Sequence, residues 1–105
     1  MRHKKFISVN LNPCLDVNYY AEEIKFDDVV RIKKKKIEAG GKGFNVARFL
    51  IQYGENIKTI GIAGGLNGIR FKKLLTESRI STEYLLDISA ETRESHNFFL
   101  KTAQY

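Results

Sequence analysis

The sequence is poor in the residues that mark several common protein classes. Its 105 residues include one cysteine, one proline and no tryptophan. A single cysteine, Cys14, cannot form an internal disulfide. It also lacks the accompanying His and Cys residues that a metal site would need. A lone cysteine of this kind is typical of a protein in a reducing compartment. No apolar run approaches the roughly 20 residues of a membrane span, and no secretory signal is visible. We therefore expect a cytoplasmic protein without membrane contact.

The remaining composition is that of one folded domain. Hydrophobic residues make up 43% and charged residues 29% of the chain, which does not indicate disorder. The formal net charge of +6 favours an anionic partner. Nucleic acid, membrane surfaces and phosphorylated metabolites all qualify, and net charge alone does not choose between them.

Four consecutive lysines, Lys33–Lys36, suggest a nucleic-acid patch. Val30 and Ile32 precede this run and Ile37 follows it, however, and lysines commonly protect exposed strands. Neither interleaved aromatic residues nor a recognition helix accompanies the run. We favour a solvated strand and expect no nucleic acid as partner.

Hydrophobic periodicity predicts an α/β protein. Strands are predicted over residues 6–11, 15–20, 29–38, 57–62, 84–88 and 96–101. A first helix follows the glycines at 40–43, with an apolar face of Val46, Phe49, Leu50 and Tyr53 and an end at Gly54. A flexible turn containing Gly61, Gly64, Gly65 and Gly68 leads into a second helix. Strand–helix–strand units imply a parallel sheet, and the strands within residues 15–38 fit better in a separate small sheet.

The turn Gly40-Gly41-Lys42-Gly43 is the strongest functional signal. Glycines allow close approach of a ligand to the backbone, the following helix points its free N–H groups at the turn, and Lys42 adds a charge. An anion site and a tight turn without ligand are equally compatible with this pattern. The spacing fits neither a P-loop nor the Gly-x-Gly-x-x-Gly dinucleotide motif, because Lys36 and Val46 stand where glycines are required.

Three polar residues are further candidates for a sugar-phosphate site. Asp16 could accept hydrogen bonds from sugar hydroxyls or cap a turn. Asn45 could contact a polyol or face solvent. Arg93 could bind a phosphate through its planar guanidinium or be an ordinary surface arginine.

Two motifs together resemble the start of ribokinase-like (phosphofructokinase B-type) sugar kinases. They are Leu11-Asn12-Pro13-Cys14-Leu15-Asp16 and Ala39-Gly40-Gly41-Lys42-Gly43-Phe44-Asn45-Val46-Ala47. The similarity continues through residues 61–65 and Gly68 into Glu91-Thr92-Arg93. Within the family the chain is most similar to 1-phosphofructokinase and tagatose-6-phosphate kinase.

The resemblance implies the amino-terminal part of one ribokinase-like domain. Its fold would be a three-layer α/β/α core with a small β-sheet lid, incomplete in this chain. Residues 1–14 and 39–92 would belong to the core, and residues 15–38 and 94–105 to the lid. Lids of this family often pair between two subunits, so a homodimer through the lid is implied.

The resemblance also implies a function and a set of site residues. Asp16, Gly40, Gly41, Lys42 and Asn45 would contact a phosphosugar, and Arg93 would hold its existing phosphate. The complete enzyme would use ATP and Mg²⁺ to convert fructose 1-phosphate to the 1,6-bisphosphate, with tagatose 6-phosphate as the alternative substrate. The family's catalytic aspartate belongs to a Gly-Ala-Gly-Asp motif, which the 105 residues do not contain and which is expected beyond Tyr105. No catalytic residue is therefore predicted within the chain.

Residues 1–105 alone are expected to lack kinase activity, since phosphoryl transfer requires both substrates to be positioned. If the chain is naturally this short, it would be a non-catalytic module for sugar-phosphate binding or dimerisation.

Overall fold

The computed structural model describes residues 5–101, which form two sheets and two helices. The strands are β1 (Phe6–Asn10), β2 (Cys14–Ala21), β3 (Lys34–Gly40), β4 (Ile57–Gly64), β5 (Tyr84–Ile88) and β6 (Arg93–Leu100). The helices are α1 (Lys42–Gln52) and α2 (Gly65–Glu77). The predicted α/β class is confirmed.

Three predictions concern the ends of the chain and lie outside the described residues. They are the assignment of residues 1–4 to the core, the assignment of residues 102–105 to the lid, and the expectation that the catalytic aspartate lies beyond Tyr105. All three stay predictions.

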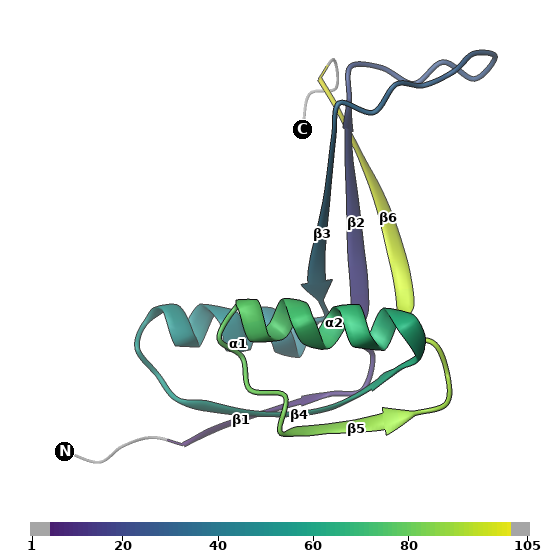
Figure 1. Cartoon of the computed structure of the whole chain (residues 1–105). Coiled ribbons are helices and arrows are strands. Elements are labelled where there is room, and N and C mark those ends of the chain that lie inside the picture. Colours follow the sequence, from purple (N-terminus) through teal and green to yellow (C-terminus); the bar gives the residue numbers. More distant parts are fainter. Residues whose placement is uncertain (1–4, 102–105) are drawn as a thin grey trace.

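The core sheet has the strand order β1-β4-β5, and all its pairs are parallel, as predicted. Both helices lie on one face of this sheet (Figure 1). On β1, the side chains that face the helices are the buried Ser8 and Asn10, whereas Ile7 and Val9 are exposed on the other face. No element within residues 5–101 covers that other face.

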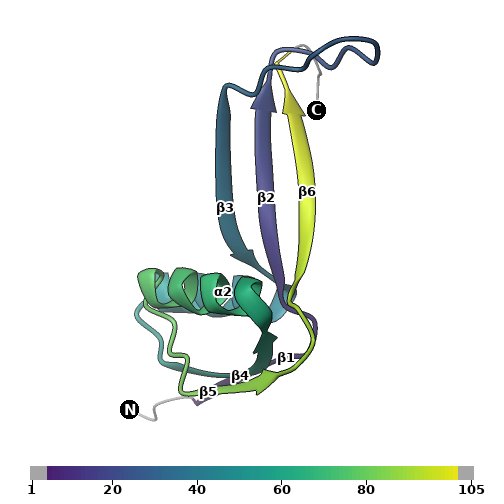
Figure 2. The same ribbon diagram turned by 45° about the vertical axis from the view of Figure 1, so that its right-hand side comes forward.

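The second sheet, here called the lid sheet, has the order β3-β2-β6 and projects away from the core (Figures 1 and 2). Strand β2 pairs antiparallel with β3 and parallel with β6. As predicted, the lysines of β3 are exposed; the ammonium groups of Lys34 and Lys35 lie 5.8 Å from the ring centroids of Tyr20 and Tyr19. The exposure of these lysines places them on a solvated strand, where their ammonium groups can also make cation–π contacts.

Three predicted boundaries are wrong. The strand predicted from His96 already begins at Arg93. The strand predicted from Val29 begins only at Lys34, because the pairing of β2 with β3 ends at Tyr20 opposite Lys34. The predicted flexible glycine turn is instead a direct junction, in which β4 ends at Gly64 and α2 begins at Gly65.

The predicted apolar face of α1 is also not its buried face. Val46, Phe49 and Tyr53 are more than half exposed, whereas Phe44 and Ala47 are fully buried. The helix carries apolar residues on more than one side, so spacing alone did not identify the side that packs on the sheet.

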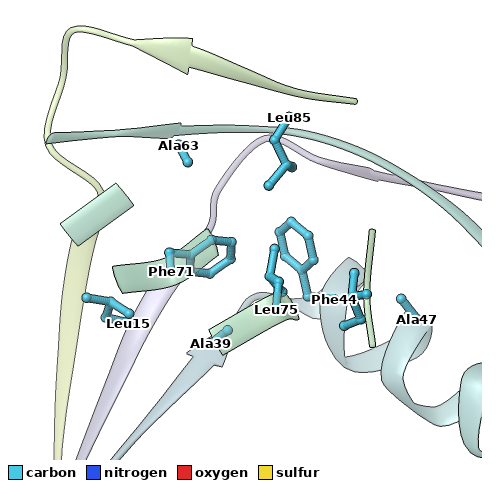
Figure 3. Close-up of a cluster of buried hydrophobic side chains, with 9 residues drawn as sticks. Leu15, Ala39, Phe44, Ala47, Ala63, Phe71, Leu75 and Leu85 are labelled. Atoms are coloured by element: carbon cyan, nitrogen blue, oxygen red, sulfur yellow. The ribbon is translucent and has the colours of Figure 1, made fainter. Parts of the chain in front are cut away.

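The core joins both sheets to the helices (Figure 3). Leu15 and Ala39, at the base of the lid sheet, belong to the same cluster as Phe71 and Leu75 of α2. Phe44 of α1 meets Phe71 edge to face, with 4.9 Å between ring centroids. The root of the lid sheet is therefore fixed by the same packing that holds the two helices.

Candidate functional site

Two of the three glycines of the predicted turn lie close to a side chain, and the third has a backbone conformation that favours glycine. A Cβ on Gly40 would lie 2.2 Å from Oδ2 of Asp16, so the carboxylate of Asp16 sits directly over this residue. Gly41 has φ 119° and caps α1, a conformation that L side chains rarely adopt. A Cβ on Gly43 would lie 1.9 Å from Oδ1 of Asn10. Two of the three glycines thus accommodate close side chains of this chain.

A buried polar pair beneath Gly43 holds the start of α1 on the sheet. The Ser8 hydroxyl donates to the Gly43 carbonyl at 2.9 Å. The Asn10 amide donates to Ser8 Oγ at 3.0 Å and to the Ile60 carbonyl at 3.2 Å. Asn10 Oδ1 is buried and has no hydrogen-bond partner among the described residues. The pair links β1, β4 and α1 at one point.

Four of the six predicted site residues line one cavity of about 560 Å³. They are Gly41, Lys42, Asn45 and Arg93. Asn10, Asn12 and Gly43 also line it, together with Val9 and Leu11 of the adjoining segment. The cavity therefore lies where β1 ends, α1 begins and β6 begins.

Asp16 and Gly40 do not line this cavity but lie beside it in the lid sheet, in contact with each other. The buried Cys14 thiol donates to Asp16 Oδ1 at 3.4 Å. Burial raises the pKa of the Cys14 thiol, and the hydrogen bond and negative charge of Asp16 raise it further. The thiol therefore stays protonated near neutral pH, and it supports the carboxylate as a hydrogen-bond donor.

Two residues that were not among the predicted site residues make hydrogen bonds to predicted ones. Arg48 donates to Asn45 Oδ1 at 3.1 Å and to the Ala39 carbonyl at 2.6 Å. Asn12 Oδ1 accepts from Nε of Arg93 at 2.8 Å. The contact between Arg48 and Asn45 could have been predicted from the sequence, because residues three apart on a helix are neighbours. Asn12 and Arg93 are 81 residues apart, so no local sequence pattern predicts their contact.

The cavity is electrostatically suited to an anion. Helix α1 begins beside it at Lys42 with no acidic residue in its first turn and no side-chain cap, so its N-terminal N–H groups face this region. Lys42 and Arg93 add charge from separate elements. Among the described residues, no acidic side chain lines the cavity.

Residues 5–101 contain no group of three or more His, Cys, Asp or Glu side chains that could hold a metal ion. In the same range, neither helix has the length and hydropathy needed to cross a membrane.

Comparison with known proteins agrees with this arrangement. A family model described as pfkB family carbohydrate kinase matches residues 9–104. That range includes every predicted site residue and all strands after β1. The chain belongs to the pfkB family. Membership in the pfkB family confirms the resemblance inferred from the two sequence motifs.

Solved structures of sugar kinases share the fold of this pfkB chain. Phosphofructokinase-2 from Escherichia coli in complex with fructose-6-phosphate is 25% identical, with a TM-score of 0.79 over 92% of this chain and 32% of that chain. A possible 1-phosphofructokinase from Thermotoga maritima is 25% identical, with a TM-score of 0.77 over 94% of this chain and 32% of that one. A tetrameric inhibited form of the Escherichia coli enzyme is 24% identical, with a TM-score of 0.77 over 95% and 32%. The chain spans about a third of the length of these structures.

Proposed function

We propose that this chain forms the acceptor side of an ATP-dependent phosphosugar kinase, a 1-phosphofructokinase that converts fructose 1-phosphate to fructose 1,6-bisphosphate. The observation that carries the proposal is the cavity at the start of α1, where Lys42 and Arg93 converge from different elements. A guanidinium and an ammonium beside free helix N–H groups match the charge and the hydrogen-bonding capacity of a phosphate.

The polar groups around the cavity suit the sugar part of such a ligand. Asn45 keeps its amide N–H groups available, because Arg48 engages only its oxygen. Asp16 is half-buried and held by Cys14, so its carboxylate is a fixed acceptor beside the cavity. A carboxylate and an amide together both accept from and donate to sugar hydroxyls. We assign Asp16 and Asn45 to the sugar, and Lys42 and Arg93 to the phosphate.

ATP and Mg²⁺ are part of this proposal for the complete enzyme, and we assign none of the described residues to them. We also place the enzyme in the cytoplasm, where a kinase of phosphorylated sugars has its substrates. The reaction itself needs the donor nucleotide aligned with the acceptor hydroxyl, so acceptor binding is the property of this chain that is open to direct test.

Calorimetric titration with fructose 1-phosphate tests the proposal. The chain is expected to bind it, and Arg93→Ala is expected to weaken binding about ten- to a hundredfold because a charge-assisted pair is lost. Arg70→Ala is the matched control, since Arg70 is an exposed arginine of α2 that does not line the cavity. Its affinity for fructose 1-phosphate should stay within about twofold of the unchanged chain.

The choice of ligands separates the alternatives. Tighter binding of tagatose 6-phosphate or fructose 6-phosphate than of fructose 1-phosphate would overturn the assigned substrate but keep the site. Salt-sensitive binding of an oligonucleotide without binding of any phosphosugar would overturn the site itself. An equal loss of affinity in the Arg70 and Arg93 variants would show that only overall charge matters.

We also propose that two copies associate through the lid sheet. Tyr19 stacks on Phe98 at 4.9 Å and Tyr20 on Phe99 at 5.1 Å, and both phenylalanines remain at least 40% exposed. Adjacent residues of a strand point to opposite faces, so each face carries one aromatic pair. Sedimentation is expected to show a dimer that Phe98→Ser shifts toward monomer, with the similarly exposed Phe49→Ser as control. A monomer at high micromolar concentration would contradict this.

A further inference from the structure

The segment that enters β6 is fastened to the start of α2 by four hydrogen bonds. The Thr92 N–H donates to the Gly64 carbonyl at 2.9 Å, and the Gly64 N–H donates to Thr92 Oγ1 at 3.0 Å. The Asn67 side chain donates to the Thr92 carbonyl at 2.9 Å, and its N–H donates to Glu91 Oε1 at 2.6 Å. We call Gly64, Asn67, Glu91 and Thr92 the latch.

Glu91 supplies to α2 what the helix lacks in its own sequence. The first turn of α2 has no acidic residue, and Gly64 offers no side chain to cap it. The carboxylate of Glu91 arrives from 24 residues farther along the chain and accepts an N–H group of this turn. A negative charge at this end of a helix also interacts favourably with the helix dipole. The latch therefore ties the entry of β6 to a helix terminus.

Arg93 follows the latch directly and opens β6, where it pairs with Cys14 of β2. Its Nε donates to Asn12 Oδ1 at 2.8 Å. Its terminal amino groups make no hydrogen bond within residues 5–101, and the side chain lines the cavity. The backbone of Arg93 is thus fixed by the latch, its side chain is fixed by Asn12, and its anion-binding end is left free.

We propose that the latch and Asn12 are positioning residues for Arg93. A free arginine side chain loses much rotamer freedom when it binds a phosphate, and supports that restrict it in advance reduce that loss. The latch sets the direction in which the Arg93 main chain leaves the core, and Asn12 sets the plane of the guanidinium. This inference rests on the proposed function only in taking a phosphosugar phosphate as the anion that Arg93 meets.

The NMR resonance of the Arg93 Nε–H group tests the inference without any ligand. Glu91→Ala removes the hydrogen bond from the Asn67 N–H and thereby loosens the backbone next to Arg93. It is expected to shift the Arg93 Nε–H resonance and to raise the exchange rate of this group with water about tenfold, because the bond to Asn12 is then held less firmly. Glu91→Gln keeps an oxygen that can accept from Asn67 and should restore most of the protection. Asn12→Ala changes an exposed side chain and should abolish the protection while the fold remains intact.

Titration with fructose 1-phosphate and with unphosphorylated fructose gives the second readout. Glu91→Ala and Asn12→Ala should each weaken fructose 1-phosphate binding several-fold and leave any fructose binding unchanged. Glu83→Ala removes an exposed carboxylate outside the latch and serves as the charge-matched control.

The two readouts separate the two proposals. If the unchanged chain binds no phosphosugar, the proposed function fails, and the Nε–H resonance still decides the latch. An Arg93 Nε–H resonance that is unaltered in a folded Glu91→Ala variant overturns the role of the latch, and one unaltered in Asn12→Ala overturns the role of Asn12.

Discussion

Replacing Phe44 with alanine is expected to lower the free energy of unfolding by about 3–5 kcal/mol, the cost typical of a buried Phe truncated to Ala. The Phe44 side chain is 0% exposed and packs edge to face on Phe71. Its loss removes both the buried apolar area and an aromatic contact, and it leaves a cavity between α1 and the core sheet. Because small domains are only marginally stable, a large fraction of the variant should be unfolded at 25 °C. Urea denaturation followed by circular dichroism measures the change.

The same helix provides a control of the same residue type. Phe49 is 57% exposed and contacts Tyr53, with 4.8 Å between ring centroids. Phe49→Ala should therefore cost no more than about 1 kcal/mol. The sequence pattern made the opposite prediction, since it placed Phe49 and Tyr53 on the apolar face. An equal or larger cost for Phe49→Ala would contradict the packing described for α1.

Sequence patterns predicted the positions of the strands but not the buried face of α1. The strands were found because β-favouring runs end at glycine, proline or polar residues, and these breaks act locally. In α1, apolar residues occur on two sides of the helix, and the buried side includes the small Ala47. Which side faces the sheet depends on where Ser8 and Asn10 hold Gly43. The hydrogen bond between Ser8 and Gly43 joins residues 35 positions apart, so the hydrophobic periodicity of α1 cannot predict it.

The candidate site likewise has one part that is encoded locally in the sequence and another that depends on distant residues. The glycines, Lys42 and the start of the helix are neighbours in the chain, so the pattern at residues 40–43 could suggest an anion site from the sequence alone, and this site stays a prediction. The supports of the site are distant from it in sequence. Asn12 reaches Arg93 across 81 residues, and Glu91 reaches α2 across 24. The parallel pairing of β2 with β6 brings Asn12 beside Arg93, and the parallel pairing of β4 with β5 brings Glu91 to the start of α2.

Replacing Gly64 with alanine is the second change with a large expected effect, a loss of about 3 kcal/mol in the free energy of unfolding. A Cβ at this position would lie 2.0 Å from the carbonyl oxygen of Ala90 and 2.4 Å from that of Ile88. Both are backbone atoms, so no side-chain rotation relieves the clash. The backbone of Gly64 is extended, with φ −155°, a conformation open to any residue, so the cost is steric.

Gly54→Ala separates this steric effect from the conformational cost of losing a glycine. Gly54 has φ +79°, and a Cβ added there would have no neighbouring atom within 4 Å, so alanine should cost about 1 kcal/mol from backbone strain alone. Urea denaturation of both variants gives the comparison. A Gly64→Ala cost equal to that of Gly54→Ala would mean that the segment after β5 does not lie against the end of β4. If Gly64→Ala lowers the free energy of unfolding by the expected value of about 3 kcal/mol, the end of β4 is held by backbone contact with the segment after β5. Because this end of β4 also carries the latch, β6 then enters the lid sheet from a fixed point beside the cavity.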